Sequence, residues 1–549
     1  MGYTTIYQGG IGMVDTVMKQ IDACLDKKEN FLLSGGAGSG KTYTLVQTLH
    51  HVFNKNPRAQ VACITYTNVA ANEIRERSPY KRLHVSTIHD FLWEVIKDYQ
   101  KNLKQSLLVL VSGNTAQRSA MISYSGEGMI TDESFDTVQY QNYSDIQNGV
   151  ISHDDILKIA NYMFATYPLL SKILCDKYDY IFVDEYQDTQ ESVIEIFLKH
   201  IKGSAKDSLG VGFFGDRMQS IYDTGIGDGI QEYINTKDIY EIKKEDNYRC
   251  STKVIDLLNR IRSDIKQKPA KKNEDGTIVN KTGTAIFLYS DKNFDLQDFQ
   301  TSKYSIGWDF KNYEETKVLF LTHKLSAARL GFYDLLAAFP NSDRIIGKEP
   351  DYLAGHLLQI GNIIYNYKKK CFPVVLDSMH RKIKTNEDKK CVSKVLSDIE
   401  SSIDITTIEE IINRFDKEEI LKIDDRFNQY VETYVETYNK VKKLSSSQIL
   451  SYFSYYNSHS PYSTQHGIKG AEFENVLVVM DNGRWNNYNF NYYFEQTPNK
   501  ESVIQRTERI VYVCCSRAKN NLIVYYPKPT AAIIERAKEL FGVDNVKKM

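Results

Sequence analysis

No stretch of the sequence approaches the roughly 20 consecutive apolar residues that a membrane-spanning helix needs. The first residues lack a basic region followed by an apolar core, so neither a secretory signal nor a membrane partner is expected. An excess of one charge is also missing, because 69 Lys and Arg residues are balanced by 70 Asp and Glu. This balance disfavours a protein that coats nucleic acid by bulk charge. It leaves room for a local basic groove, because binding responds to the local field.

The sequence has only eight cysteines, none in a CxxC pair and none clustered with histidine at metal-binding spacing. A structural zinc or iron–sulfur centre is therefore disfavoured, and reduced thiols in a cytoplasmic protein are expected. Proline is scarce, with 11 residues, whereas tyrosine is abundant, with 38. The tyrosines suit either core packing or base stacking, and composition does not choose between them.

Short apolar runs stand directly before turn or helix signals, which is typical of strands in parallel sheets. They fall into one set in the first half of the chain and another that runs to near its end. Together they predict an α/β fold with two parallel-sheet cores. The runs are 30–34, 61–65, 180–183, 211–214, 285–289, 318–321, 476–479 and 521–525.

Two mainly helical stretches interrupt this alternation, so each core is expected to carry a helical insertion. A segment rich in Lys, Asn, Asp and Gly, 266–281, is typical of a surface linker between the cores. Within the second insertion, apolar residues at helical spacing predict one amphipathic helix from Tyr430 to Val441. The expected boundaries are 1–95 and 171–280 for the first core, 96–170 for its insertion, 281–349 and 446–549 for the second core, and 350–445 for its insertion.

A glycine-rich segment between an expected strand and an expected helix matches the phosphate-binding loop. It consists of Gly35, Gly36, Ala37, Gly38, Ser39, Gly40, Lys41 and Thr42. Glycines let the backbone turn its N–H groups toward phosphates. Lys41 is expected to reach the β- and γ-phosphates, and the Thr42 hydroxyl to hold Mg²⁺. The sequence thus predicts ATP and Mg²⁺ as bound groups.

Acidic residues at the end of the 180–183 run supply the second half of such a site. Asp184 is expected to hold Mg²⁺, and Glu185 to orient and deprotonate the attacking water. Without the phosphate loop, this pair would read as solvated turn residues. Arg249 and Arg517 are candidates for stabilising charge on the departing γ-phosphate. A surface ion pair is the alternative for either arginine taken alone.

An ordered series of segments resembles superfamily 1 DNA helicases of the UvrD/Rep group. The series runs from about residue 31 to 525 and includes the phosphate loop and the acidic pair. Its other members are 65–74 (TYTNVAANEI), 85–91 (VSTIHDF), 215–222 (GDRMQSIY), 247–249 (NYR), 463–473 (STQHGIKGAEF) and Arg517. Single matches of this kind are weak, but seven or more in order are specific.

The resemblance implies two RecA-like cores and a role for each matched residue. Gln219 is expected to sense the γ-phosphate, Tyr248 to stack on adenine, and Glu472 to touch the nucleotide. Gln20 has plausible spacing for the glutamine that reads adenine, with Gln8 as the alternative. Tyr222 is a further candidate near the strand, a buried core tyrosine being the other reading. The residues expected to line the DNA groove are Thr67, Asn68, Thr87, His89, Thr464 and His466.

Some positions depart from the family pattern. Val69 stands where the family usually has lysine, and 223–227 (DTGIG) replaces the usual aromatic residue and arginine after Tyr222. The aromatic and asparagine-rich segment Trp485–Phe494 is distinctive, and suits either base stacking or the docking of a partner. This segment resembles stand-alone helicases encoded beside nuclease partners, of which Gabija-type antiphage systems are one setting.

The motifs together predict an ATP-dependent translocase or helicase on single-stranded or 3′-tailed DNA. The resemblance implies that ATP is hydrolysed between the two cores and that movement is 3′ to 5′. The alternative is a regulatory DNA-sensing ATPase subunit that licenses a partner nuclease and unwinds little, which the departure at 223–227 favours. An ATPase with no nucleic-acid role is a third, weaker reading.

Overall fold

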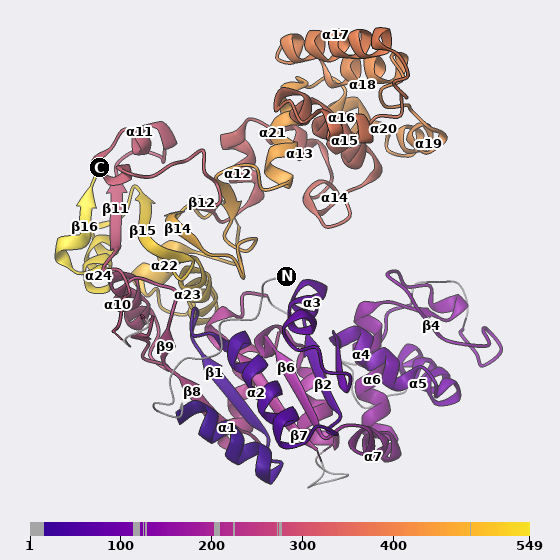
Figure 1. Ribbon diagram of the computed structural model, residues 1–549, viewed down its shortest axis with the longest axis vertical. Helices are drawn as coiled ribbons and strands as arrows, with labels where there is room; N and C mark the ends of the chain where they lie inside the picture. The colour runs from indigo at the N-terminus through magenta and orange to yellow at the C-terminus, as the bar shows by residue number, and fades with distance from the viewer. Residues whose placement is uncertain are drawn as a thin grey trace. The chain divides into compact units, whose positions relative to one another are not determined.

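The computed structural model describes residues 16–113, 121–124, 126, 129–201, 209–222, 225–271, 273, 277–483 and 485–549. The chain forms two compact units, Met1–Lys281 and Thr282–Met549. Each unit contains a six-stranded sheet in which all neighbouring strands run parallel, with helices on both faces (Figure 1). The predicted α/β fold with two RecA-like cores is therefore confirmed. No helix in the described ranges is long and apolar enough to cross a bilayer.

The sheet of the first unit has the strand order β3-β2-β6-β7-β1-β8. Its strands are β1 (Phe31–Gly35), β2 (Val61–Thr65), β3 (Leu83–Thr87), β6 (Tyr180–Asp184), β7 (Gly210–Gly215) and β8 (Tyr240–Lys244). The helices around it are α1 (Thr16–Lys27), α2 (Lys41–Lys55), α3 (Asn68–Arg77), α4 (Ile88–Ile96), α8 (Glu191–Glu195) and α9 (Ile230–Asn235). A further helix of this unit, α10 (Thr252–Ile261), contacts residues 268–269. Between β3 and β6 come α5 (Gln100–Ser112), β4 (Gln139–Tyr140), β5 (Val150–Ile151), α6 (His153–Thr166) and α7 (Pro168–Lys177).

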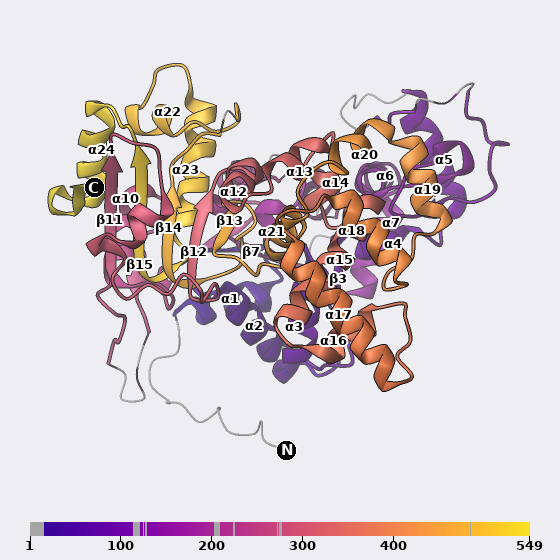
Figure 2. The ribbon, with the colours of Figure 1, turned by 90° about the horizontal axis from the view of Figure 1, so that it is seen from above.

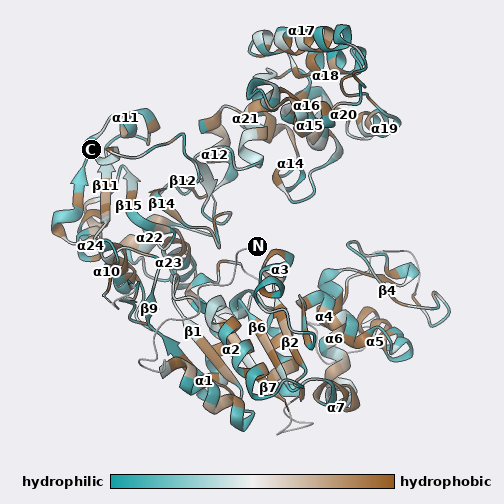
Figure 3. Cartoon of the chain, in the orientation of Figure 1, coloured by the Kyte–Doolittle hydropathy of each residue, from teal (hydrophilic) through white to brown (hydrophobic). Residues whose placement is uncertain are grey.

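Both faces of this sheet are buried, which explains why its central strands are continuous apolar runs (Figure 3). Successive side chains of a strand point to opposite faces. Leu32 of β1 accordingly packs with Phe91 of α4, in one core cluster. Its neighbour Leu33 belongs to the other cluster, with Leu45 of α2 and Ile74 of α3.

The sheet of the second unit has the order β13-β12-β14-β15-β11-β16. Its strands are β11 (Thr284–Ser290), β12 (Thr316–Phe320), β13 (Tyr462–Thr464), β14 (Phe473–Val479), β15 (Ala518–Pro527) and β16 (Val546–Lys548). Helices near the sheet are α11 (Leu296–Gln300), α12 (His323–Leu330), α22 (Phe490–Glu495), α23 (Glu501–Cys515) and α24 (Ala531–Phe541). On one face of the sheet, Phe287 packs against Phe494 of α22 and Phe541 of α24.

The remaining helices of the second unit gather beyond the β12–β13 side of its sheet (Figure 2). They are α13 (Tyr333–Ala338), α14 (Asp343–Ile346), α15 (Tyr352–Lys368), α16 (Phe372–Ser378), α17 (Asn386–Ser402), α18 (Ile408–Lys417), α19 (Asp425–Thr433), α20 (Val435–Val441) and α21 (Ser447–Tyr456). Their core is continuous with one face of the sheet, because Leu353, Ile411 and Leu477 belong to the same cluster.

One local prediction is wrong, and another holds only in part. The single helix expected from Tyr430 to Val441 is two, because Tyr434 leaves the helical region at φ −117° and ψ 48° and separates α19 from α20. The segment 266–281, expected as a surface linker, ends where the two units divide, but Gln267 within it is only 2% exposed. Lys268 and Pro269 then form the short strand β10 beside β9 (Asp246–Asn247).

Candidate nucleotide and nucleic-acid site

The carboxyl ends of the parallel strands in the first unit meet at one edge of its sheet, where open α/β sheets bind ligands. The phosphate loop follows β1, and Asp184 ends β6. β7 lies between them, and Asp216 follows it directly. Thr67 and Thr87 lie just past or at the ends of β2 and β3, on the far side of β6. The acidic residues thus lie between the predicted phosphate side and the predicted DNA side.

The phosphate loop depends on glycine at two positions with positive φ. Gly38 has φ +77° and Gly40 has φ +76°, and Gly40 caps the amino end of α2. A Cβ atom on Gly38 would lie 2.7 Å from the Cβ of Arg249. One on Gly36 would lie 2.4 Å from Nε2 of Gln267. Glycine here allows both the loop curvature and the close approach of neighbouring segments.

Two buried amides bind the loop from outside, and we call Asn247 and Gln267 the loop clamp. Nδ2 of Asn247 donates to the carbonyl of Ala37 at 3.1 Å, and Nε2 of Gln267 donates to the same oxygen at 3.0 Å. The N–H of Tyr248 donates to the carbonyl of Gly38 at 2.8 Å. Asn259 fixes the backbone of Gln267, accepting from its N–H at 2.7 Å and donating to its carbonyl at 2.9 Å. The clamp therefore joins the loop to the segment 247–249.

Asp184 and Thr42, the predicted metal ligands, both offer oxygen donors, and Mg²⁺ prefers few protein carboxylates together with substrate phosphates. Asp184 is 3% exposed, and Thr42 stands in the first turn of α2 beside Lys41. Burial and the adjacent Glu185 raise the pKa of Asp184 to about 7, against the charge of Lys41. A divalent cation would favour the ionised carboxylate, so the donors fit the metal. No group of three or more His, Cys, Asp or Glu that would hold a metal alone occurs in the described ranges.

Glu185 is held in an unusual backbone conformation. Its φ is +51° in the left-handed region, which is uncommon for a residue other than glycine and is often found at active sites. Its carboxylate accepts a hydrogen bond from Nε2 of Gln187 at 2.5 Å. Oε1 of Gln187 in turn accepts from the N–H of Asp216 at 3.0 Å.

Asp216 lies at the centre of a buried network. Its carboxylate accepts from Nε2 of Gln219 at 2.9 Å and from the Arg262 guanidinium at 3.1 and 3.2 Å. The side chains of Asp216 and Arg262 are both fully buried. Arg262 and Arg217 also donate to Asp264. Burial raises the pKa of Asp264, but the hydrogen bonds and charges of the two arginines lower it more. The Asp264 carboxylate therefore stays ionised. The ion pair with Arg262 fixes Asp216, and the hydrogen bond to Asp216 in turn positions Gln219.

The other nucleotide candidates of the first unit differ in their surroundings. Tyr248 is 46% exposed, and its hydroxyl donates to Asp246 at 3.1 Å. Nζ of Lys244 lies 5.8 Å from the centre of its ring. The Arg249 N–H donates to Oδ1 of Asn247 at 3.0 Å, beside the loop. Gln20 lies half-buried in α1 and makes no hydrogen bond to the loop within the described ranges, while Gln8 lies outside them.

The predicted DNA residues of the first unit lie at helix starts. Thr67 caps α3, whose first residue is Asn68, and both are exposed. Thr87 caps α4 and donates to Asp90 at 2.8 Å. The rings of His89 and His153 are tilted by 32°, with their centres 4.9 Å apart. Burial, followed by the charge of His153, lowers the pKa of His89 to about 4. His89 is therefore neutral at pH 7 and offers a hydrogen bond rather than a charge.

Tyr222 is 40% exposed, so it is a surface residue and not a core tyrosine. Burial of part of the ring, together with Asp188, raises the pKa of its hydroxyl. Of the divergent segment that follows it, Asp223 and Thr224 lie outside the described residues.

In the second unit, the predicted residues lie at both ends of the sheet. Thr464 ends β13 and accepts from the N–H of Gly467 at 3.0 Å. The exposed Glu472 stands before β14, and Arg517 stands before β15. Arg517 is 1% exposed, and its guanidinium donates to the carbonyls of Val513 and Ala471 at 3.0 and 3.3 Å.

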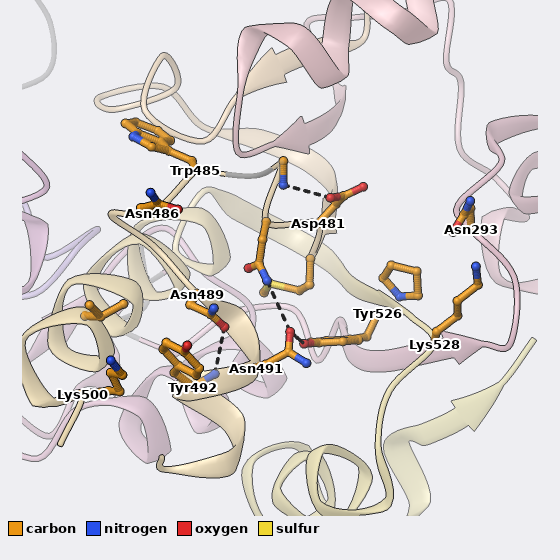
Figure 4. A pocket seen from close by; sticks show the side chains of 15 residues that line it. Asn293, Asp481, Trp485, Asn486, Asn489, Asn491, Tyr492, Lys500, Tyr526 and Lys528 are labelled. Carbon is orange, nitrogen blue, oxygen red and sulfur yellow. Dashed lines mark hydrogen bonds between the residues drawn. The ribbon is translucent and has the colours of Figure 1, made fainter. Parts of the chain in front are cut away.

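The aromatic segment Trp485–Phe494 lies directly against His466. The Tyr488 hydroxyl and Nε2 of His466 are 2.8 Å apart, and the Trp485 ring lies 5.3 Å from the imidazole. Trp485 is 38% exposed at the rim of a cavity of about 680 Å³ at the carboxyl ends of β14 and β15 (Figure 4). The asparagine side chains of the segment bond both backbone and side chains. Oδ1 of Asn489 accepts from the N–H of Tyr492 at 3.0 Å, and Oδ1 of Asn491 accepts from the Tyr526 hydroxyl at 3.0 Å.

The sequence motifs contained Asn247 and Gln187 but suggested no role for either. Arg262 and Gln267 belong to no motif, and their functional position rests only on contacts between distant segments. A buried glutamine or arginine in an otherwise polar stretch carries no periodic signal that would single it out.

A family model described as an AAA domain matches residues 20–224. Gabija protein GajB of Bacillus cereus (strain HuB5-5) is 26% identical, over 94% of this chain and 96% of its own length. ATP-dependent DNA helicase PcrA of Leuconostoc citreum is 23% identical over 46% of this chain, and ATP-dependent DNA helicase Rep of Buchnera aphidicola subsp. Acyrthosiphon pisum is 27% identical over 42%. The matches span only 40% of PcrA and 42% of Rep. They confirm the predicted resemblance: the chain is similar to UvrD/Rep-like superfamily 1 helicases and, over nearly its whole length, to GajB.

Proposed function

We propose that the protein is an ATP-dependent DNA helicase or translocase that moves 3′ to 5′ on single-stranded or 3′-tailed DNA. The observation that carries this proposal is the shared edge of the first sheet. There, the phosphate loop, Asp184 and the network around Gln219 adjoin the ends of β2 and β3. The names of the PcrA and Rep relatives support the same reaction.

In this proposal, Lys41 binds the phosphates and Thr42 and Asp184 hold Mg²⁺, which when bound offsets charge on the phosphates. Glu185 accepts the proton of the attacking water. Arg249, with Arg517 of the second unit, stabilises charge on the γ-phosphate. Tyr248, Glu472 and Gln20 contribute to nucleotide binding. The DNA-binding residues are Thr67, Asn68, Thr87, His89, Tyr222, Thr464 and His466.

Strand displacement on matched substrates tests the proposal. The full chain is given ATP and Mg²⁺ with a 3′-tailed, a 5′-tailed or a blunt duplex of the same sequence. Displacement of the 3′-tailed duplex alone, absent in Glu185→Gln, is the expected result. Preference for the 5′ tail overturns the direction. An ATP hydrolysis rate that single-stranded DNA leaves unchanged overturns the nucleic-acid role.

A second candidate is a regulatory ATPase subunit of an antiphage system, which senses DNA and licenses a partner nuclease. Similarity to a Gabija protein over 96% of that protein's length favours it, as does the divergent segment after Tyr222. DNA-stimulated ATP hydrolysis without strand displacement, together with copurification of a nuclease from the native host, would favour this candidate. Both proposals place the protein in the cytoplasm. All eight cysteines lie in described positions, and none forms a disulfide.

A further inference from the structure

We propose that Gln187 is a positioning residue that couples Glu185 to the segment Asp216–Tyr222, so that occupancy of the DNA site alters ATP hydrolysis. This inference rests on the proposed function, because it assigns the connection between its two sites. Gln187 is 0% exposed and stands two residues after Glu185.

The side chain of Gln187 uses both of its polar ends in opposite directions. Its amide nitrogen donates to the Glu185 carboxylate, and its amide oxygen accepts from the backbone N–H of Asp216. Because the amide group is planar and rigid, its oxygen and nitrogen move together. A shift of the backbone at Asp216 therefore moves the donor that holds Glu185.

The packing around Gln187 leaves little room for its side chain to move independently. A Cβ atom on Gly215 would lie 2.2 Å from Oε1 of Gln187, and one on Gly225 would lie 2.1 Å from its carbonyl oxygen. Both positions therefore need glycine. That carbonyl also accepts a hydrogen bond from the Ser220 hydroxyl at 3.2 Å. Gln187 thus contacts Gly215, Ser220 and Gly225 through both its backbone and its side chain.

The far end of the connection extends toward the protein surface. Asp216 is anchored by Arg262, whereas Tyr222, six residues further along, is 40% exposed. A DNA strand that contacts Tyr222 would displace the segment Asp216–Tyr222, which Arg262 anchors at Asp216. Gln219 belongs to the same segment and shares the carboxylate of Asp216. The segment therefore reaches both proposed sites.

At the ATP-hydrolysis end of this connection, the Glu185 carboxylate depends on neighbouring residues for its position. Glu185 has a left-handed backbone, a conformation that costs energy and persists only where its surroundings enforce it. A general base works only when it is aimed at the proton it removes. The hydrogen bond from Gln187 is therefore well placed to set how often Glu185 points at the attacking water.

Two substitutions at position 187 test the coupling. Gln187→Met is close in shape but removes both hydrogen bonds, and Gln187→Glu keeps the acceptor for Asp216 while losing the donor to Glu185. Gln190→Met is the matched control, because Gln190 is the same residue type three positions on and has no hydrogen bond to either site among the described residues. Thermal unfolding identifies which variants fold, and either folded variant suffices.

The readouts are the steady-state ATP hydrolysis rate with and without single-stranded DNA, and the affinity for a fluorescent ATP analogue. We expect DNA to stimulate ATP hydrolysis by wild type and by Gln190→Met to the same extent. In both variants at position 187, stimulation should fall to near 1 while affinity for the analogue is unchanged. A merely structural defect would instead lower affinity and unfolding temperature together.

The outcomes separate the two proposals. If DNA stimulates ATP hydrolysis by the folded variants at position 187 as much as by wild type, the coupling is overturned and the proposed function stands. Wild-type hydrolysis that DNA does not stimulate overturns the nucleic-acid role, and the coupling with it. Loss of stimulation in Gln190→Met as well would show that the effect is not specific to Gln187, and also overturns the inference.

Discussion

Nδ2 of Asn247 donates a hydrogen bond of 3.1 Å to the carbonyl of Ala37, 210 residues earlier in the chain. Oδ1 of the same side chain accepts from the N–H groups of Arg249 and Cys250 at 3.0 and 2.9 Å. One asparagine thus fixes the phosphate loop and the segment that carries the predicted adenine-stacking tyrosine.

Asn247→Ala is expected to weaken ATP binding while leaving the fold intact. The substitution leaves two buried N–H groups without their acceptor, at a cost of about 1–3 kcal/mol. If that cost falls on the nucleotide-bound loop, affinity for ATP drops by about 5- to 150-fold. Titration with a fluorescent ATP analogue measures it. Asn54→Ala, on the exposed face of α2, is the control, and equal affinity in both variants would contradict the clamp.

Lys41→Ala and Glu185→Gln are expected to abolish hydrolysis for different reasons. Loss of the Lys41 ammonium removes a contact to the phosphates, so ATP binding also weakens. Glu185→Gln removes the base and should lower the hydrolysis rate by about 10²–10⁴-fold with binding retained. A coupled phosphate-release assay and a binding titration separate the two effects. A Glu185→Gln variant that hydrolyses at the wild-type rate would exclude the assigned base.

Arg517→Ala is expected to lower ATP hydrolysis by about 10³–10⁵-fold, the usual cost of losing an arginine finger. The side chain also donates to two carbonyls inside the second unit, so stability must be measured in parallel. Arg517→Lys is the companion variant, because lysine keeps the charge but not the planar donor geometry. Undiminished hydrolysis in the alanine variant would remove Arg517 from the site.

His356 should make the second unit less stable in mild acid. Burial lowers the pKa of this imidazole to about 4, although Asp424 opposes the shift. Among the described residues, its Nε2 has no hydrogen-bond partner. In the unfolded chain His356 binds a proton below about pH 6.5, whereas in the folded chain it does so only near pH 4. The free energy of unfolding therefore decreases as the pH falls from about 6.5 to about 4. The loss approaches about 3 kcal/mol at full protonation.

His356→Leu should flatten this dependence, and urea unfolding at pH 7.5 and pH 5 measures it. The exposed His380, in the same insertion, is the comparison, as His380→Gln. Because the charge of His380 also lowers the pKa of His356, this variant should weaken the pH dependence less than His356→Leu does. An unchanged pH dependence in His356→Leu would show that other groups cause the acid sensitivity.

Trp485→Ala distinguishes base stacking from partner docking. If Trp485 stacks on a base, the variant should lose about 1–3 kcal/mol of single-strand affinity, the usual contribution of one stacked base. Fluorescence anisotropy with a labelled oligonucleotide measures this, with Tyr492→Ala as the control in the same segment. Unchanged DNA affinity together with loss of a copurifying protein would favour docking.

The sequence predicts the sheet centres well and the sheet edges poorly. All eight predicted apolar runs overlap strands, whereas β3, β8, β13 and β16 were not predicted as strands. These four are the edges of the two sheets. An edge strand buries fewer residues, so β8 (YEIKK) and β16 (VKK) have no continuous apolar run.

Motifs located the phosphate loop and acidic pair, because phosphate chemistry fixes residue types locally. Gln187, Arg262 and Gln267 could not be assigned, since their partners come together only through the fold.

The short, polar edges also bear on how this protein can meet others. An exposed edge strand recruits a further strand from another chain when it is long, flat and apolar. Here β13 and β16 have three residues each, and β16 ends in Lys547 and Lys548. Neither edge of the second sheet offers a template for strand addition. A protein partner of this unit is therefore expected to bind through helices or loops, and cross-β self-association is disfavoured.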